Sequence, residues 1–299
     1  MSAVTETRLP GVRLIRRGKV RELYDLGNSL LLVATDRISA FDCVLSPGIP
    51  DKGRVLTSLS NFWFDRFSDV ENHILEKDAD RFPEPVAFSK DLLAGRAVVV
   101  KKAEVIPFEC VARGYIAGSG WTDYQRSGEI CGIRLPPRLL QASRLPEPIF
   151  TPATKSSSGH DQNVSFERMA GAIGREEAAA LRDRTLDLYR RAREYAETRG
   201  LILADTKLEF GRFEGRLLWI DEAFTPDSSR YWDARLWKEG QRPASFDKQF
   251  LRDWLESTHW NKRPPAPQLP EGIVRTTRSK YLEAHRLLTG HLPRGVTAS

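Results

Sequence analysis

The chain has little cysteine and no long apolar run. Of its 299 residues only three are cysteines (Cys43, Cys110 and Cys131), and no two of them form a CxxC pair. This scarcity argues against a disulfide framework and against a structural zinc site. The longest apolar stretches, near residues 30–34 and 97–100, are too short to span a bilayer. Because the N-terminal residues also lack a signal-peptide pattern, we expect a cytoplasmic protein with no membrane partner.

The chain also lacks a strong excess of charge of either sign. The net charge is +6, but 46 basic residues are interleaved with 40 acidic ones and no long basic tract occurs. Anionic small-molecule substrates explain this balance as well as nucleic acid does. A nucleic-acid-binding protein remains an alternative, although zinc-finger spacing, an RNP-like aromatic stretch and a basic helix are all lacking. We therefore expect no nucleic-acid partner.

The first part of the chain shows the turn residues of an antiparallel β-meander, with turns at Gly18 and at Gly27-Asn28. A helix should follow, capped by Thr57 or Ser58. The expected strands are 12–17, 20–25, 29–35, 96–105 and 109–116. Together these elements predict a β-rich lobe over residues 1–112.

The rest of the chain alternates helical and extended patterns. Residues 175–200 are rich in helix formers and carry one apolar stripe, made by Leu181, Leu188, Ala192 and Tyr195. Further expected elements are strands in 201–222 and helices at 245–258 and 278–289. The organisation predicted from them is an α/β lobe over 113–232 and a C-terminal helical segment over 233–299.

Residues 203–230 hold a predicted β-hairpin with two carboxylates on one face. If the turn contains three residues, 214–216, then Glu209 lies opposite Asp221, whereas a two-residue turn would place Glu209 opposite Ile220. Only the first register sorts the side chains, with Leu208, Phe210, Leu218 and Ile220 on one face and Lys207, Glu209, Trp219 and Asp221 on the other. Opposed carboxylates repel unless a cation lies between them, and oxygen ligands suit Mg²⁺. The alternative is that Lys207 or a neighbouring arginine neutralises the pair.

Several polar stretches have residues suited to anions. The first is GKVR at 18–21, which places a glycine and a lysine at a hairpin turn. The others are ECVARGY and GSGW within 109–121, TPATKSSSGHDQN at 151–163 and TPDSSR at 225–230. Glycine lets backbone amides approach a phosphate, and arginine offers a fork of donors. Each stretch can also be read as an ordinary turn, cap or linker.

In their order along the chain, six stretches resemble the SAICAR synthetase family: GKVRELYD, ATDRISAFD, ECVARGYIAGSGW, TPATKSSSGHDQN, LILADTKLEFG and DEAFTPDSSRYW. The resemblance implies an α/β (α+β) fold with two lobes, similar to a kinase or an ATP-grasp enzyme, and ATP between the lobes. It implies an ATP-dependent ligase that joins L-aspartate to carboxyaminoimidazole ribonucleotide (CAIR), with ATP and Mg²⁺ as cofactors. We expect a monomer or a small homo-oligomer. Another ATP-dependent ligase or a small-molecule kinase on the same scaffold is the alternative.

The resemblance also implies roles for individual residues. The ATP contacts would be Gly18, Lys19, Arg21, Lys101 and Glu109. The CAIR contacts would be Arg113, Ser119, Asp227, Ser229 and Arg230. The loop beside the aspartate would contribute Lys155, His160 and Asp161. The magnesium ligands would be Glu209 and Asp221. The catalytic residues would be Lys207, Lys19 and Asp221. Two departures from the family pattern are the serines 156–158 with Gln162, where acidic residues are frequent, and Ala117, where a hydroxyl residue is frequent.

Overall fold

The computed structural model describes residues 2–155 and 162–297. The chain divides into two compact units, each built from segments that are distant in sequence. Unit 1 comprises Met1–Glu104, Arg212–Asp227 and Asp247–Ser299, and unit 2 comprises Val105–Gly211 and Ser228–Phe246. These limits differ from the predicted ones: residue 112 falls inside a strand of unit 2, and the segment 233–299 is shared between the units.

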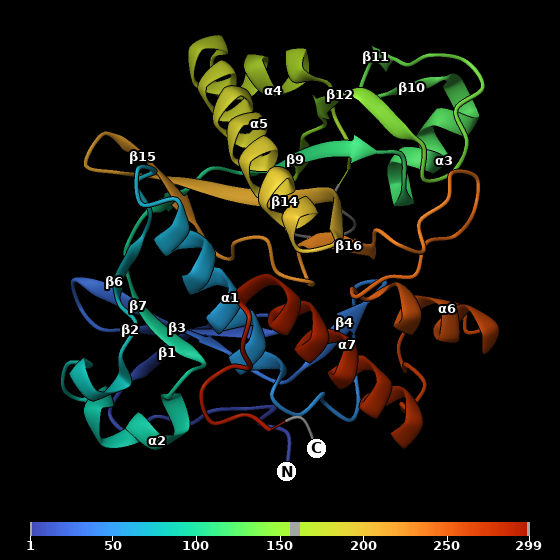
Figure 1. The fold of residues 1–299 in the computed structure, drawn as a ribbon. Helices are drawn as coiled ribbons and strands as arrows, with labels where there is room; N and C mark the ends of the chain where they lie inside the picture. Colours follow the sequence, from blue (N-terminus) through green and yellow to red (C-terminus); the bar gives the residue numbers. More distant parts are fainter. Residues whose placement is uncertain (1, 156–161, 298–299) are drawn as a thin grey trace. The chain divides into compact units, whose positions relative to one another are not determined.

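Unit 1 is built around the predicted meander, extended to an antiparallel sheet in the order β1-β2-β3-β7-β6 (Figure 1). The strands are β1 (Arg13–Arg17), β2 (Arg21–Asp25), β3 (Ser29–Ala34), β7 (Ala97–Lys101) and β6 (Ile74–Glu76). Alternate residues of these strands, such as Leu31, Val33 and Val99, point into one buried apolar core. The first three strands confirm the prediction to within one residue at each end.

The first helix of unit 1 begins earlier than the sequence indicated. Helix α1 spans Lys52–Arg66, so the predicted caps Thr57 and Ser58 lie inside it and the predicted start was wrong. The predicted start rested on Thr57 and Ser58 as cap residues, whereas the helix extends further toward the N-terminus through Gly53. Here glycine is required, since a Cβ at this position would lie 2.2 Å from the carbonyl oxygen of Ala34.

The C-terminal helices complete unit 1. Helix α6 spans Gln249–Ser257, and helix α7 spans Glu271–Thr289, directly after Pro270. The predicted start at 278 was too late, since proline favours the first turn of a helix. Helix α7 packs beside α1 (Figure 1). The short elements are β4 (Ile38–Ala40), β5 (Cys43–Leu45), α2 (Lys90–Leu93), β15 (Arg216–Ile220) and β8 (Glu104–Val105), the last at the unit boundary.

Unit 2 contains antiparallel strands covered by a long helix. Its strands are β9 (Phe108–Tyr115), β10 (Glu129–Ile130), β11 (Ile133–Arg134), β12 (Arg144–Phe150), β13 (Ala153–Thr154), β14 (Leu201–Phe213) and β16 (Ser229–Asp233), and its helices are α3 (Gly118–Ser127), α4 (Phe166–Ile173) and α5 (Arg175–Thr198). The order β12-β9-β14-β16 places Arg113 of β9 beside Asp205 of β14. Helix α5 packs on β9 and β12 and buries the predicted stripe at Leu181, Leu188 and Ala192.

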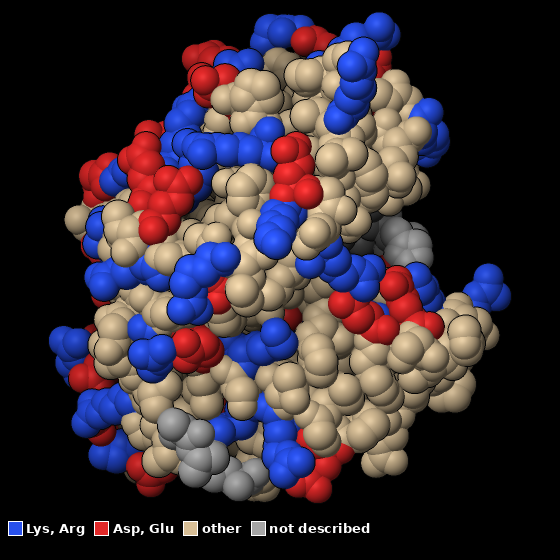
Figure 2. Space-filling model, turned by 45° about the vertical axis from the view of Figure 1, so that its right-hand side comes forward, with Lys and Arg blue, Asp and Glu red and all other residues tan. Residues whose placement is uncertain are grey.

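Charged side chains of both signs are interleaved on the face shown in Figure 2. Within 2–155 and 162–297, none of the helices combines the length and the apolar character needed to cross a membrane.

Candidate active site

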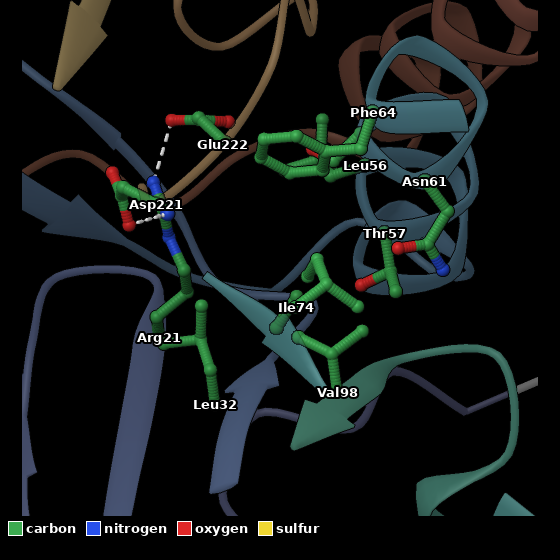
Figure 3. Close-up of a pocket in the computed structure, with 12 residues that line it drawn as sticks. Arg21, Leu32, Leu56, Thr57, Asn61, Phe64, Ile74, Val98, Asp221 and Glu222 are labelled. Carbon is green, nitrogen blue, oxygen red and sulfur yellow. Dashed lines mark hydrogen bonds and ion pairs between the residues drawn. The ribbon is translucent and has the colours of Figure 1, made fainter. Parts of the chain in front are cut away.

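A cavity in unit 1 brings Arg21 together with two carboxylates (Figure 3). Arg21 extends from β2, and its guanidinium donates to Asp221 and, at 2.5 Å, to Glu222, both of which directly follow β15. The apolar wall comes from β3, β6, β7 and α1, through Leu32, Ile74, Val98, Leu56 and Phe64. The cavity volume is about 30 Å³, the room that one water molecule occupies.

The other predicted ATP contacts of unit 1 lie at the ends of strands. Lys19 is half-exposed in the turn between β1 and β2, where its ammonium pairs with Asp42. Lys101 ends β7 and donates to the carbonyl oxygen of Asn72 at 3.4 Å. Both lysines therefore stand at the rim of the sheet that carries Arg21.

Asp227 is the most enclosed of the predicted site residues in unit 1. One carboxylate oxygen accepts from Lys52 at 2.7 Å and from Lys248 at 3.0 Å, and the other accepts from Tyr281 at 2.6 Å. Burial alone would raise the pKa of Asp227, but the two ammonium groups hold this pKa below its usual value. Because both oxygens are already engaged, the contacts give Asp227 a structural role, and the predicted contact with CAIR stays a prediction.

In unit 2, two arginines share one buried carboxylate. Arg113 donates to Asp205 at 2.9 Å, to Thr151 at 2.9 Å and to Ser119 at 3.2 Å, and Arg230 donates to the same oxygen of Asp205. Arg113 is only 4% exposed, and burial lowers its pKa although Asp205 opposes the shift. The cluster holds two positive charges and one negative charge, so it suits an anionic ligand.

Gly118 makes room for this cluster. It has a φ of +54°, and a Cβ there would lie 2.2 Å from Nη2 of Arg230. The predicted contact Ser229 lies nearby in β16, where its hydroxyl bonds that of Thr206 at 2.8 Å. The structure thus gathers Arg113, Ser119 and Arg230, three of the predicted CAIR contacts.

A second charged cluster in unit 2 surrounds Glu209. Lys207 lies 2.6 Å from Glu209 and 3.0 Å from Glu109, and Lys155 pairs with the other oxygen of Glu209. Burial would raise the pKa of Glu209, but the two lysines lower it below its usual value. The carboxylate is therefore ionised, and each of its oxygens is paired with a lysine.

The predicted three-residue hairpin turn is wrong. Strand β14 ends at Phe213 and β15 begins at Arg216, so the turn holds Glu214 and Gly215. Their φ values of +50° and +74° are those of a two-residue turn of type I′. Trp219, expected on the polar face, is fully buried against Phe64.

Leu208, Phe210, Leu218 and Ile220 are all buried, as expected. With a two-residue turn, however, Leu208 and Phe210 lie on the face opposite to that of Leu218 and Ile220, so the predicted sorting onto one apolar face is wrong. Glu209 and Asp221, however, belong to different units, and each pairs with cations of its own unit. These contacts match the alternative in which lysine or arginine neutralises the carboxylates. That the two carboxylates share one cation remains a prediction.

Two of the predicted residues, His160 and Asp161, lie outside the described residues. Next to that stretch, an open hollow of about 500 Å³ in unit 2 is lined by polar residues that include Asp123, Arg126 and Asn163. Its volume falls in the range of small-molecule sites.

Sequence reasoning missed several residues that complete these clusters, namely Lys52, Asp205, Glu222, Lys248 and Tyr281. Asp205 had a recognisable signal, since it is a carboxylate that ends the apolar strand pattern LILAD. Lys52 had none, because its partner Asp227 is 175 residues away in sequence.

Comparisons with known proteins identify the relationship. The family model described as SAICAR synthetase matches residues 14–267. The phosphoribosylaminoimidazole-succinocarboxamide synthase of Pelobacter propionicus is 56% identical over 96% of this chain and 98% of its own length. The enzyme of the same name from Thermodesulfovibrio yellowstonii is 52% identical over 96% of this chain and 99% of its own length.

Solved structures agree with the sequence relatives. The SAICAR synthase of Saccharomyces cerevisiae, in a structure described as complexed with SAICAR, is 40% identical with a TM-score of 0.87, over 97% of this chain and 99% of that chain. These matches confirm the resemblance and the α+β fold inferred from the six stretches. The chain belongs to the SAICAR synthetase family.

Proposed function

We propose that the protein is an ATP-dependent ligase that joins L-aspartate to the carboxylate of CAIR, giving SAICAR, ADP and phosphate in purine biosynthesis. The observation that carries the proposal is the identity of 52–56% to enzymes of this name over 96% of the chain. The clusters at Arg113 and at Arg21 supply side chains suited to anionic substrates. A cytoplasmic location and a small homo-oligomer or a monomer remain predictions.

In this proposal the cluster of Arg113, Asp205 and Arg230 receives the ribonucleotide. Its surplus positive charge attracts a phosphate or a carboxylate, and the guanidinium forks orient planar oxyanions. Asp205 fixes both forks, so little side-chain entropy is lost on binding. Ser119, already bonded to Arg113, adds a hydroxyl that adapts to either role.

In the same proposal most of the nucleotide contacts come from unit 1, and Glu109 comes from unit 2. Gly18 and Lys19 sit in the hairpin turn that would cover the phosphates, and Lys101 with Glu109 would pass the adenine. The adjacent carboxylates Asp221 and Glu222 form an oxygen donor set of the kind that Mg²⁺ prefers. Mg²⁺ held by these carboxylates would neutralise charge on the triphosphate. In this structure Arg21 pairs with both of them.

Among the described residues no group of three or more acidic, histidine or cysteine side chains gathers. This is compatible with Mg²⁺, which commonly uses one or two carboxylates together with phosphates and water. Glu209 is the further predicted ligand.

The chemistry requires activation, since a carboxylate is a poor electrophile. The CAIR carboxylate would attack the γ-phosphorus of ATP, breaking the bond to ADP and forming an acyl phosphate. The amine of aspartate would then attack the acyl carbon, the bond to phosphate would break, and the proton would leave to solvent. The protein contributes positioning and charge neutralisation through Lys19 and Lys207.

The test is a coupled assay of ADP release with CAIR, with and without L-aspartate. We expect release that depends on both substrates and produces SAICAR. Equal ADP release without aspartate would favour a small-molecule kinase on this scaffold. Retention on a nucleic-acid column at low salt, with no ADP release, would instead favour the nucleic-acid-binding alternative.

A further inference from the structure

The backbone of the turn 18–21 is held by a buried arginine that the proposed chemistry does not use. Arg37 lies just after β3, within the stretch ATDRISAFD, and is 8% exposed. Its guanidinium donates to the carbonyl oxygens of Gly18 at 3.0 Å, of Lys19 at 3.1 Å and of Arg21 at 3.3 Å. One side chain therefore binds three of the four carbonyl groups of this turn.

Thr35 takes the remaining carbonyl group of the turn. Its amide donates to the carbonyl oxygen of Val20 at 3.0 Å, and its hydroxyl donates to the same oxygen at 2.8 Å. The fully buried Thr35 hydroxyl also accepts from the amide of Arg37 at 3.3 Å. All four carbonyl groups of residues 18–21 thus point to the segment 35–37.

The amides of the same turn are placed differently. Within the described part of the chain, the amides of Lys19 and Val20 have no hydrogen-bond acceptor, whereas the amide of Gly18 donates to the carbonyl oxygen of Arg21 at 2.8 Å. Successive backbone amides of a turn that have no protein acceptor are available to an anion. Carbonyl groups that pointed toward the same anion would repel it. Because Thr35 and Arg37 bind the carbonyl groups, the amides of the turn remain available to the anion.

The position requires arginine because its donors point in several fixed directions. Nε and Nη2 donate to the carbonyl oxygens of the turn. Nη1 donates to the carbonyl oxygen of Thr5 and, at 3.0 Å, to Glu22. Glu22 is fully buried and neutralises the guanidinium. Lysine would bring one ammonium and three donors at a single point, so it cannot span the same set of carbonyl groups.

We propose that Arg37 and Thr35 are positioning residues that hold the backbone of residues 18–21 in the shape that receives a nucleotide phosphate. The proposal rests on the proposed function, since it takes this turn as the phosphate contact. Both side chains are buried and bonded to the carbonyl groups of the turn, so they act through the turn.

The experiment measures ADP affinity by calorimetric titration of the full chain, alongside the melting temperature. For Arg37→Lys we expect ADP binding weakened about 10- to 100-fold, since a displacement of about 1 Å at a contact is enough for such losses. For Thr35→Val we expect a weakening of a few-fold, and for Thr35→Ser, which keeps the hydroxyl, the affinity of the wild type. The KM for aspartate should change less than the KM for ATP in each case.

Arg96→Lys is the matched control. Arg96 is as buried as Arg37 and pairs with Asp36 at 3.0 Å, but no hydrogen bond joins it to residues 18–21. It should lower the melting temperature without weakening ADP binding.

The proposal is overturned if folded Arg37→Lys binds ADP within two-fold of the wild type, or if Arg96→Lys weakens binding equally. If Arg37→Lys does not fold, the comparison of Thr35→Val with Thr35→Ser decides, and equal affinities overturn the proposal. A wild type that binds ADP but makes no SAICAR refutes the proposed function alone. A wild type that binds no ADP refutes both.

Discussion

The substitution Asp205→Asn tests whether the two-arginine cluster is held by its single carboxylate. The asparagine keeps the shape of the side chain and removes its charge, so the ion pair of Asp205 with Arg113 at 2.9 Å and its ion pair with Arg230 are both lost. The side chains of Arg113 and Asp205 are only 5% and 6% exposed. Water therefore cannot replace the lost charge without opening the sheet.

The magnitude follows from the burial of the pair. Breaking a buried ion pair by removing one partner costs about 3–5 kcal/mol. Arg230 is 22% exposed and can turn toward water, so we expect the lower end, about 3 kcal/mol. With an m-value of about 3 kcal/mol/M, the urea midpoint falls by about 1 M.

The assay is urea unfolding followed by circular dichroism, with hydrogen exchange of the β9 and β14 amides to assign the transition to unit 2. Glu129→Gln is the control, because its pair with Arg134 at 3.1 Å lies at the surface and should cost no more than about 0.5 kcal/mol. A loss below about 1 kcal/mol for Asp205→Asn would refute the view that this carboxylate holds the cluster.

Three further predictions concern other sites. Burial lowers the pKa of His285 to about 4, so its contribution to stability is present above the unfolded pKa of about 6.5 and is lost as pH falls toward 4. Between pH 6.5 and 4 the free energy of unfolding of His285→Gln should fall by about 3 kcal/mol less than that of the wild type. If the free energy of unfolding of both proteins changes equally with pH, the role assigned to His285 is contradicted. Gly118→Ala should displace Arg230 and raise the KM for CAIR about 10-fold or more, whereas Gly128→Ala, with a φ of +72° and open space around it, should only lower the melting temperature. Asp221→Asn should lower turnover about 100-fold with a smaller effect on stability, and normal turnover at ordinary magnesium concentrations would argue against the metal role.

Much of the fold could be predicted from local patterns. The meander and the long helix 175–200 follow from periods of two and 3.6 residues, which depend on neighbours in sequence. The start of α1 could not, because Gly53, a residue unfavourable inside a helix, is required there by the close approach of the Ala34 carbonyl group. The hairpin register failed for a related reason. The pattern assigned Trp219 to the polar face, but aromatic residues distant in sequence bury it.

For the site, residue types were predictable and their pairings were not. Arg113 and Asp205 are 92 residues apart, and Arg21 and Asp221 are 200 residues apart. Which cation meets which carboxylate at such separations depends on the arrangement of the strands, which local patterns do not encode. The motifs therefore indicated phosphate-binding chemistry while leaving open which groups already neutralise each other.

Asp227 shows how the pairing changes the interpretation of a motif residue. The stretch TPDSSR suggested a carboxylate available to a substrate, yet the side chain is held by Lys52 from α1, by Lys248 just before α6 and by Tyr281 from α7. Removing Lys248 or Tyr281 would leave a buried group short of a partner, which costs more than the bond itself contributes. The C-terminal part of unit 1 therefore has a role beyond packing. Lys248, just before α6, and Tyr281 of α7 fix the conformation of the loop that carries the family motif TPDSSR.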